Sequence, residues 1–267
     1  MKSLKQREGF IVKNDFKTVA LLTAAGTGTR MNMEVPKQFY TVMDKPIIIY
    51  TLEAFENHPS IDEIIVACLK EWIAPLTAFA KQNGITKLKY IVPGGDTGQQ
   101  SITNCLNFLK ENGLGDNDIV MVHDGNRPLV SNDVISSSIA TCLSNGNAVA
   151  HVPCNEVIVT TEDQKVCVDQ LDRDHVKRTQ TPHTCRFGEM YEDYQEMIRR
   201  GETGVVAPCS VWMKLGKPTY LSLGSEFNFK ITRREDLELF EALVQAKAYQ
   251  QSLGGGFSPK LTKKINY

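Results

Sequence analysis

Two glycines and two cations near the start of the chain have the types and spacing of a phosphate-binding site. Gly26 and Gly28 follow an apolar run, and Arg30 and Lys37 come shortly after them. Because glycine has no side chain, backbone N–H groups can approach an anion closely, and the two cations can neutralise phosphate charge. We therefore expect a strand followed by a loop that grips a nucleoside triphosphate. The alternative is an ordinary glycine-rich turn with solvated cations.

Two common nucleotide-binding loops do not match this stretch. A dinucleotide fingerprint would need a small residue where Met31 stands. A Walker A loop would need Gly-Lys-Ser/Thr at positions 31–33, which read Met-Asn-Met. The sequence therefore disfavours a nicotinamide-dependent oxidoreductase.

An acid and a second cation follow another apolar run. Asp124 and Arg127 come just after residues 118–123. A carboxylate there can position a divalent ion or a polar substrate, and the arginine can meet a phosphate. The alternative is that Asp124 caps the helix that follows Pro128.

Three further segments place polar groups at turns or at the ends of elements. The turn Gly94-Gly95-Asp96 precedes Ser101, which we expect to begin a helix, and such mixed donors and acceptors can read a cytosine. Arg173 can reach a second anion, or can be a solvated charge. Lys230 is expected between a strand and a helix, where it would point to the same edge of the sheet as Lys37. The alternative is an ordinary surface lysine.

Apolar runs and helical patterns alternate along the chain, which indicates an α/β fold. Strands alternating with helices form βαβ units, hence a mostly parallel sheet with helices on both faces and a ligand beyond the carboxyl ends of the strands. The glycine loop and Asp124 both fall at such ends. The expected strands are 18–23, 63–68, 88–92, 118–123, 148–152 and 220–223, and the expected helices are 47–55, 72–81, 101–109, 134–143 and 187–199.

Residues 155–180 break this alternation and are expected to form a hairpin arm. Two short strands, 156–161 and 165–169, flank a turn at 162–164. Because a lone hairpin cannot bury both its faces, we expect it to pack on a partner chain or to fold over the site.

The carboxyl end of the chain carries a helix signal followed by a glycine-rich tail. Thr232 and Glu235 have capping-box spacing, and Leu237, Phe240 and Val244 give the helix an apolar face. We expect a single domain over 15–250 and a flexible tail over 251–267.

Composition excludes several classes of protein. The net charge of −1 gives no general attraction to nucleic acid or anionic membranes. The seven cysteines show no C-x-x-C and the five histidines no paired ligand spacing, which favours reduced thiols and argues against a protein zinc site. No apolar run approaches the ~20 residues of a membrane span, and the first residues contain no signal-peptide core. We expect a soluble cytoplasmic protein.

Taken together, these motifs resemble the 4-diphosphocytidyl-2-C-methylerythritol synthase family of cytidylyltransferases, which includes the ribitol-5-phosphate enzymes. The resemblance runs from about Val19 to Val244. It rests on Ala24-Ala25-Gly26-x-Gly28-x-Arg30-Met31, Pro36-Lys37-Gln38, Gly94-Gly95 with Ser101, Val122-His123-Asp124-x-x-Arg127-Pro128, Arg173, Thr181-Pro182, and Asn228-x-Lys230-x-Thr232-x-x-x-Asp236-Leu237.

The resemblance implies that CMP passes from CTP to a polyol phosphate, with pyrophosphate as the other product. It implies a Rossmann-like three-layer α/β/α nucleotidyltransferase core and a hairpin arm that exchanges across a homodimer. Mg²⁺ would be held mainly by the CTP phosphates, with Asp124 as a weak protein ligand. The catalytic group would be Arg30, Lys37, Lys230 and Asp124; the nucleotide-binding group Ala24, Ala25, Gly26, Thr27, Gly28, Gly95, Asp96 and Ser101; and the acceptor-binding group Arg127, Arg173, Thr181 and Val157.

The chain departs from the family pattern at four places, three of which fall on the acceptor side, whereas Gly98 removes a cation near the nucleotide. Gly98 stands where an arginine is usual, and Glu156-Val157 stands where an Asp-Thr pair is usual. Residues 206–210 lose an acid of a Thr-Asp-(Asp/Glu)-Ala-Ser segment, and Gly125-Asn126 replaces Ala-Ala and is closer to the ribitol branch. A ribitol-5-phosphate-like acceptor is therefore favoured over 2-C-methyl-D-erythritol 4-phosphate. A non-catalytic nucleotide-binding relative and a sugar-transferring enzyme of the same fold remain alternatives.

Overall fold

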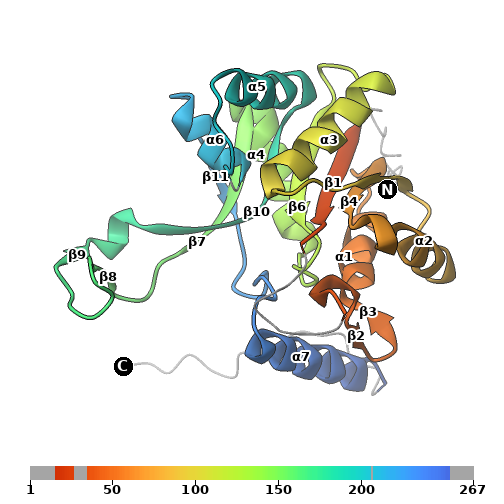
Figure 1. Cartoon of the computed structure of the whole chain (residues 1–267). Helices are drawn as coiled ribbons and strands as arrows, with labels where there is room; N and C mark the ends of the chain where they lie inside the picture. Colours follow the sequence, from red (N-terminus) through yellow and green to blue (C-terminus); the bar gives the residue numbers. More distant parts are fainter. Residues whose placement is uncertain (1–15, 27–34, 206, 253–267) are drawn as a thin grey trace, which may run out of the picture.

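A seven-stranded sheet runs through the residues that the structure describes (Figure 1). The structure is a computed structural model, and it describes residues 16–26, 35–205 and 207–252. The strand order is β11-β7-β10-β6-β1-β4-β5, and every neighbouring pair is parallel except those that β10 makes with β6 and β7. The strands are β1 Thr18–Ala24, β4 Glu63–Cys68, β5 Leu88–Pro93, β6 Ile119–Asp124, β7 Asn147–Pro153, β10 Lys177–Arg186 and β11 Leu221–Leu223.

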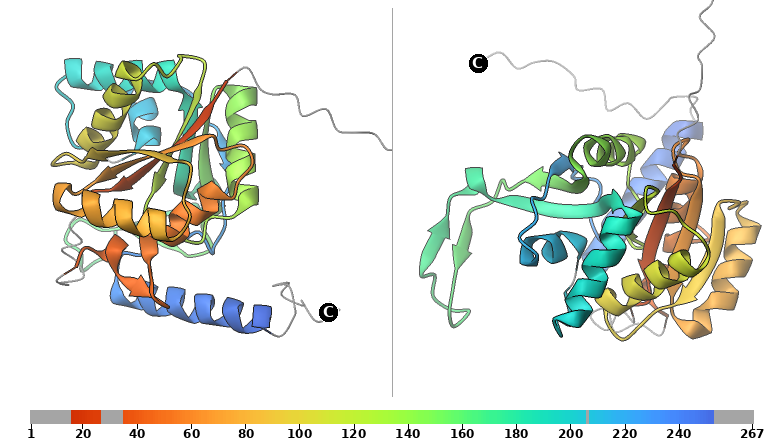
Figure 2. Two further views of the ribbon diagram at one scale, coloured as in Figure 1. Left: turned by 90° about the vertical axis from the view of Figure 1, so that its right-hand side faces the viewer. Right: turned by 90° about the horizontal axis from the view of Figure 1, so that it is seen from above.

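Helices cover both faces of this sheet, which confirms the expected α/β fold (Figure 2). Because side chains alternate along a strand, Ala20 and Leu22 of β1 pack on one set of helices, whereas Val19 and Leu21 pack on the other. The first set is α1 Ile47–Glu56, α2 Ile73–Gln82 and α4 Asn132–Asn145; the second is α3 Gly98–Glu111, α5 Phe187–Arg199 and α6 Pro208–Lys214.

The strand order changes direction at β1, which lies between β4 and β6. Thr23 near the end of β1 pairs with Asp124 at the end of β6. Gly26 lies two residues after the end of β1. The topology therefore brings the glycine loop and Asp124 to the switch point where α/β sheets bind ligands.

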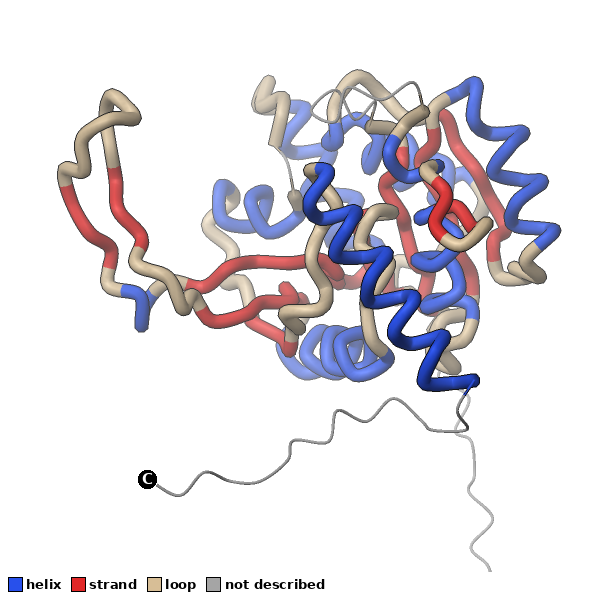
Figure 3. The backbone as a smooth tube through the Cα atoms, turned by 90° about the horizontal axis from the view of Figure 1, so that it is seen from below, coloured by secondary structure: helices blue, strands red, loops and turns tan. Residues whose placement is uncertain are grey.

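A two-stranded arm, formed by β8 (Ile158–Thr160) and β9 (Asp169–Leu171), projects away from the sheet and its helices (Figure 3). The arm does not fold over the sheet of its own chain, and its second strand lies later than the predicted 165–169. The reason is the loop between the strands. Asp163 Oδ1 accepts hydrogen bonds from the backbone N–H groups of Lys165 and Val166, which holds these residues in a turn.

The last helix, α7 (Arg234–Ser252), packs Leu237 and Phe240 against α1 and the small β2–β3 hairpin. The predicted capping partner Glu235 is wrong, since Asp236 takes this role. Its Oδ2 accepts from the backbone N–H and the hydroxyl of Thr232 and from the N–H of Arg233, each at 2.8 Å. The small hairpin is β2 Thr41–Val42 and β3 Lys45–Pro46. Short 3-10 turns within the described residues are Lys37–Phe39, Lys70–Trp72 and Arg173–His175.

Other sequence expectations need correction. Helix α3 begins at Gly98 instead of Ser101, because Thr97 Oγ1 accepts from the N–H of Gln100 and caps it. The segment 228–231 is not a strand, and the sequence did not predict β10 or α6. Thr27, Gly28, Arg30 and most of the tail lie outside the described residues.

Asp236→Ala should lower the free energy of unfolding by roughly 1 kcal/mol, because it removes the acceptor at the start of α7. Glu235→Ala, on an exposed neighbouring side chain, should leave it almost unchanged. Urea unfolding of the two variants measures this difference. Equal losses, or a larger loss for Glu235→Ala, would contradict the assignment of Asp236.

Candidate active site

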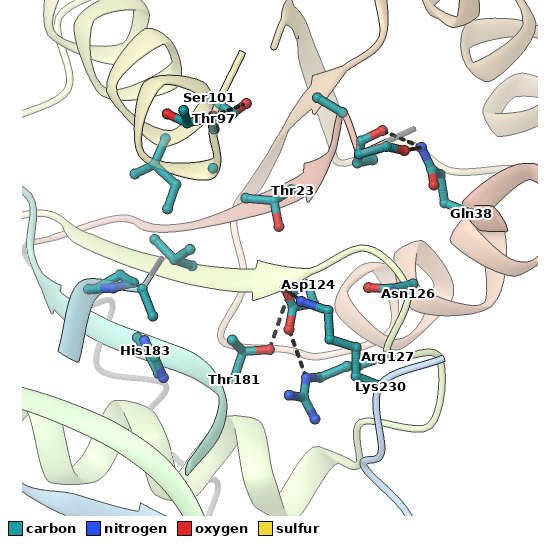
Figure 4. A pocket seen from close by; sticks show the side chains of 18 of the residues that line it. Thr23, Gln38, Thr97, Ser101, Asp124, Asn126, Arg127, Thr181, His183 and Lys230 are labelled. Atoms are coloured by element: carbon teal, nitrogen blue, oxygen red, sulfur yellow. Dashed lines mark hydrogen bonds and ion pairs between the residues drawn. The ribbon is translucent and has the colours of Figure 1, made fainter. Parts of the chain in front are cut away.

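A cleft of about 360 Å³ opens at the carboxyl ends of β1 and β6 (Figure 4). It collects residues from both halves of the sheet and from the segment before α7. The residues predicted from sequence that line it are Ala24, Ala25, Gly26, Lys37, Gly95, Asp96, Ser101, Asp124, Arg127, Thr181 and Lys230.

The carboxylate of Asp124 lies between two cations in this cleft (Figure 4). Its Oδ1 accepts from Lys230 Nζ at 2.8 Å and its Oδ2 from Arg127 Nε at 2.9 Å. Burial alone would raise the pKa of Asp124, but the two cations hold that pKa well below its ordinary value. The carboxylate of Asp124 is therefore an anion at neutral pH. Asp124 does not cap the helix that follows, because Ser131 caps α4.

The segment that carries Lys230 is tied to the strand ends by backbone and side-chain bonds. Asn126 and Ile231 exchange two hydrogen bonds, and the Asn228 carbonyl accepts from Arg127 Nη1 at 2.7 Å. Asn228 Nδ2 also donates to the Thr181 carbonyl at 2.7 Å. These bonds replace a strand ladder and fix Lys230 beside Asp124.

Thr181 connects the end of β6 to a buried histidine. Its Oγ1 accepts from the Asp124 N–H and lies 2.9 Å from His123 Nδ1. Because His123 Nε2 faces the Arg127 carbonyl at 3.3 Å, this nitrogen is the donor, and the threonine hydroxyl donates to Nδ1. Burial lowers the pKa of His123 to about 3, so the ring is neutral.

Gln38 holds the start of the glycine loop, a role that sequence reasoning missed. Its Nε2 donates to the carbonyls of Ala24 and Gly26 at 2.6 and 3.1 Å, and its side chain is buried. The only sequence signal was its place beside Lys37 in the Pro36-Lys37-Gln38 motif. Gln38 thereby fixes the backbone of residues 24–26, where β1 ends and the glycine motif begins.

The wall opposite Asp124 is built from the turn after β5 and the first turn of α3. A Cβ on Gly94 would lie 2.1 Å from Ala25 Cβ, so only glycine lets this turn abut the loop after β1. Ser101 Oγ accepts from the Gly95 N–H at 3.0 Å and donates to the Thr97 carbonyl at 2.9 Å. The turn is thus fixed against α3 before any ligand binds.

Two predicted acceptor residues lie away from this cleft. Arg173 and Val157 line a separate hollow in the arm, together with Gln170, Asp172 and Asp174. The structure therefore does not bring Arg173 to the cleft of its own chain.

The protein groups around the cleft offer little to a metal ion. Among the residues that the structure describes, no group of three or more His, Cys, Asp or Glu side chains could hold one. Asp96 and Asp124 are the carboxylates that line the cleft, and both oxygens of Asp124 already accept from cations. Asp124 fits as a single ligand to an ion held chiefly by other groups. Over the same described residues, no helix is long and apolar enough to span a bilayer.

Comparison with known proteins identifies the family. The model of the family described as 2-C-methyl-D-erythritol 4-phosphate cytidylyltransferase (IspD) matches residues 18–246. The chain belongs to the IspD family. It is therefore a cytidylyltransferase, an enzyme of the nucleotidyltransferase class.

Relatives of this IspD-family enzyme carry two different names. A ribitol-5-phosphate cytidylyltransferase of Lacticaseibacillus paracasei is 39% identical over 230 residues, which cover 85% of this chain and 98% of that protein. A 2-C-methyl-D-erythritol 4-phosphate cytidylyltransferase of Clostridium tetani is 33% identical over 229 residues, 86% of this chain and 91% of that protein.

The fold of this IspD-family chain is shared with solved structures. The 4-diphosphocytidyl-2C-methyl-D-erythritol synthase of Anaerococcus prevotii superposes with a TM-score of 0.72. The match covers 86% of this chain and 99% of that chain at 22% identity, so it shows the fold alone.

The buried neutral His123 predicts a loss of stability in mild acid. Its pKa is about 3 in the folded chain against an ordinary 6.5, so its contribution is complete above pH 6.5 and falls as pH drops below that value. Asp124 works in the same sense, since its pKa is also lowered on folding, but its effect sets in only near or below its ordinary pKa of 3.8. Between pH 7 and 5, His123→Gln should therefore reduce the fall in unfolding free energy, by up to roughly 1.4 kcal/mol per pH unit.

Urea unfolding at pH 7, 6 and 5 measures this slope. His175→Gln, on an exposed residue of the arm, is the matched control and should keep the slope of the unmodified chain. A His123→Gln slope identical to that of the control would refute the buried neutral state.

Proposed function

We propose that this cytidylyltransferase transfers CMP from CTP to an alditol phosphate, with ribitol 5-phosphate or a close analogue as the acceptor. The observation that carries the proposal is the cleft at the switch point, which Lys37, Arg127 and Lys230 line together with Gly26. The relative that is 39% identical over 98% of its length is named a ribitol-5-phosphate cytidylyltransferase, which supports this acceptor.

The reaction is an in-line displacement at phosphorus. A phosphate oxygen of the acceptor attacks the α-phosphorus of CTP, the bond to the β-phosphate bridging oxygen breaks, and pyrophosphate leaves. The protein contributes position and charge: Lys37 and Lys230 stabilise negative charge on the phosphates, and Arg127 orients the acceptor phosphate. Arg30, which belongs to the glycine motif at 24–31, is proposed to stabilise phosphate charge together with Lys37 and Lys230.

Mg²⁺ bound to the triphosphate would neutralise part of its charge and improve the leaving group. Asp124 is the residue proposed to contact that ion. The main task of Asp124 in this chain is to hold Arg127 and Lys230 in place before the substrates arrive.

The wall formed by Gly95, Asp96 and Ser101 is proposed to bind the cytosine. Its backbone N–H and C=O groups and side-chain oxygens offer both donors and acceptors to a base that presents an amino group and two acceptors. A base with a carbonyl in place of the amino group would leave some of them unpaired, so CTP should be preferred to UTP.

The runner-up acceptor is 2-C-methyl-D-erythritol 4-phosphate, which other relatives are named for. The family pattern argues against it, because Gly125 stands where the isoprenoid enzymes usually have alanine. A Cβ at this position would lie 3.0 Å from the Thr23 carbonyl and 3.3 Å from Ala24 Cβ, so an alanine would require these neighbours to shift by a few tenths of an ångström. The seven cysteines, free wherever the structure describes them, are consistent with a reducing cytoplasm.

A pyrophosphate-release assay with CTP, Mg²⁺ and a panel of acceptors tests the function. We expect the highest kcat/KM with ribitol 5-phosphate and slower turnover with 2-C-methyl-D-erythritol, erythritol, glycerol and arabinitol phosphates. A preference for 2-C-methyl-D-erythritol 4-phosphate would replace the acceptor proposed here. Absence of turnover across the whole panel would favour a non-catalytic relative.

We further propose that the arm forms a homodimer and places Arg173 in the cleft of the partner. The arm exposes apolar side chains that its own chain does not cover, namely Val157, Val159, Val166, Val168 and Leu171, which are 41–62% exposed. Burial of these side chains against a second copy would stabilise the dimer, and Arg173 at the base of β9 would then meet an acceptor phosphate.

Mixing two inactive variants tests this arrangement. Arg173→Ala and Lys230→Ala should each lose most activity alone, because each lacks one cation of every cleft. When the two chains are refolded together, a mixed dimer contains one cleft with both Arg173 and Lys230, so activity should return. No recovery in a mixture shown by sedimentation to contain dimers would place Arg173 outside the partner's site.

A further inference from the structure

His183 is a buried histidine in the wall of the cleft, and neither of its ring nitrogens has a hydrogen-bond partner (Figure 4). Its side chain is only 2% exposed. Over the described part of the chain, other buried polar side-chain atoms also have no partner, but they belong to residues that do not line the cleft: Tyr194, Trp212, Ser222, Asn228 and Gln250.

An imidazole without partners is costly to bury, since water would satisfy both nitrogens in the unfolded chain. The Gln180 carbonyl lies near enough to favour the charged ring, yet it completes no hydrogen bond to either nitrogen. A ligand group that hydrogen-bonds the imidazole would offset this free-energy cost, and His183 lines the cleft in which a ligand would bind.

The state of the ring defines which ligand group it suits. Burial lowers the pKa of His183 to about 4, against the opposing effect of Asp124, so the ring is neutral at pH 7. A neutral imidazole offers one donor and one acceptor. A hydroxyl group also donates and accepts, whereas a phosphate only accepts and would favour a charged ring.

The position of the ring points to the acceptor side of the cleft. His183 pairs with Val122 in the sheet, and its ring centre lies 6.4 Å from that of Trp212 in α6. Pro208, the first residue of α6, and its N-cap Ala207 line the same cleft as His183. The charged groups that act on the ring are Asp124 and Arg127, at the end assigned above to the acceptor phosphate.

We propose that His183 hydrogen-bonds a hydroxyl group on the carbon chain of the polyol acceptor and so helps to select a polyhydroxylated substrate. This inference rests on the function proposed above. His183 is thus a specificity-determining residue that adds to the binding of the acceptor and takes no part in the displacement at phosphorus. The ribose of CTP carries the same kind of group, and the test must separate the two sources.

The test compares substrates that differ by one hydroxyl group, in the unmodified enzyme and in two variants. His183→Leu removes both ring nitrogens at similar volume, and His183→Gln keeps one donor and one acceptor. Tyr194→Phe is the matched control, because it removes another buried hydroxyl without a partner, outside the cleft.

We expect His183→Leu to raise the KM for ribitol 5-phosphate roughly 5- to 10-fold, the worth of one hydrogen bond, with kcat and the KM for CTP nearly unchanged. The ratio of kcat/KM for ribitol 5-phosphate to that for its monodeoxy analogues should fall toward one for at least one analogue. His183→Gln should recover most of the difference, and Tyr194→Phe should behave as the unmodified enzyme.

Three results would overturn the inference. They are deoxy-substrate ratios in His183→Leu equal to those of the unmodified enzyme, a change confined to the ratio of CTP to 2′-deoxy-CTP, and an equal effect of Tyr194→Phe. Where His183→Leu fails to fold, the same ratios measured on His183→Met, which also lacks both ring nitrogens, decide the question. An unmodified enzyme without turnover on any alditol phosphate would instead remove the proposed function itself.

Discussion

The carboxylate of Asp124 is the interaction on which the rest of the site depends. A largely buried anion is stable only when cations and hydrogen bonds compensate it, and Arg127 and Lys230 both do so. These partners come from a turn after β6 and from an irregular segment far along the chain. One carboxylate therefore joins the central strand, the loop that follows it and the entry to α7.

This arrangement also solves a problem of charge. The cleft needs several cations for a polyphosphate, but cations without a counter-ion would repel one another in the free enzyme. Asp124 supplies the counter-ion. Arg127 is 12% exposed and also bonded to the Asn228 carbonyl, whereas Lys230 is 36% exposed. We expect Lys230 to turn toward the substrate phosphates while Arg127 keeps its place.

Much of the fold could be predicted from the sequence, because local patterns determined it. β-branched runs and regular apolar stripes predicted the helices other than α6 and most strands of the sheet, and the order of glycine, lysine and acid motifs located the cleft. The exception among the strands is β10, which begins Lys-Arg-Thr-Gln-Thr-Pro. Its polar first half carries no strand pattern and becomes a strand by pairing with β7, whereas its second half pairs with both β6 and β7.

The residues that the sequence did not reveal act through distant partners. Gln38 holds carbonyls of another loop, and His183 stands out only because the fold buries it without a partner. The error of one residue at the start of α7 has a similar cause. Spacing alone allowed Glu235, but the path of the chain from Lys230 turns Asp236 toward Thr232.

The measurement that tests this account most directly is the turnover of an Asp124→Asn enzyme. The amide keeps the size of the side chain and one acceptor oxygen but removes the charge that balances the two cations. The account predicts a folded protein whose kcat/KM for CTP and for the acceptor both fall by roughly 10²-fold or more. A folded Asp124→Asn enzyme with unchanged kcat/KM for both substrates would contradict it.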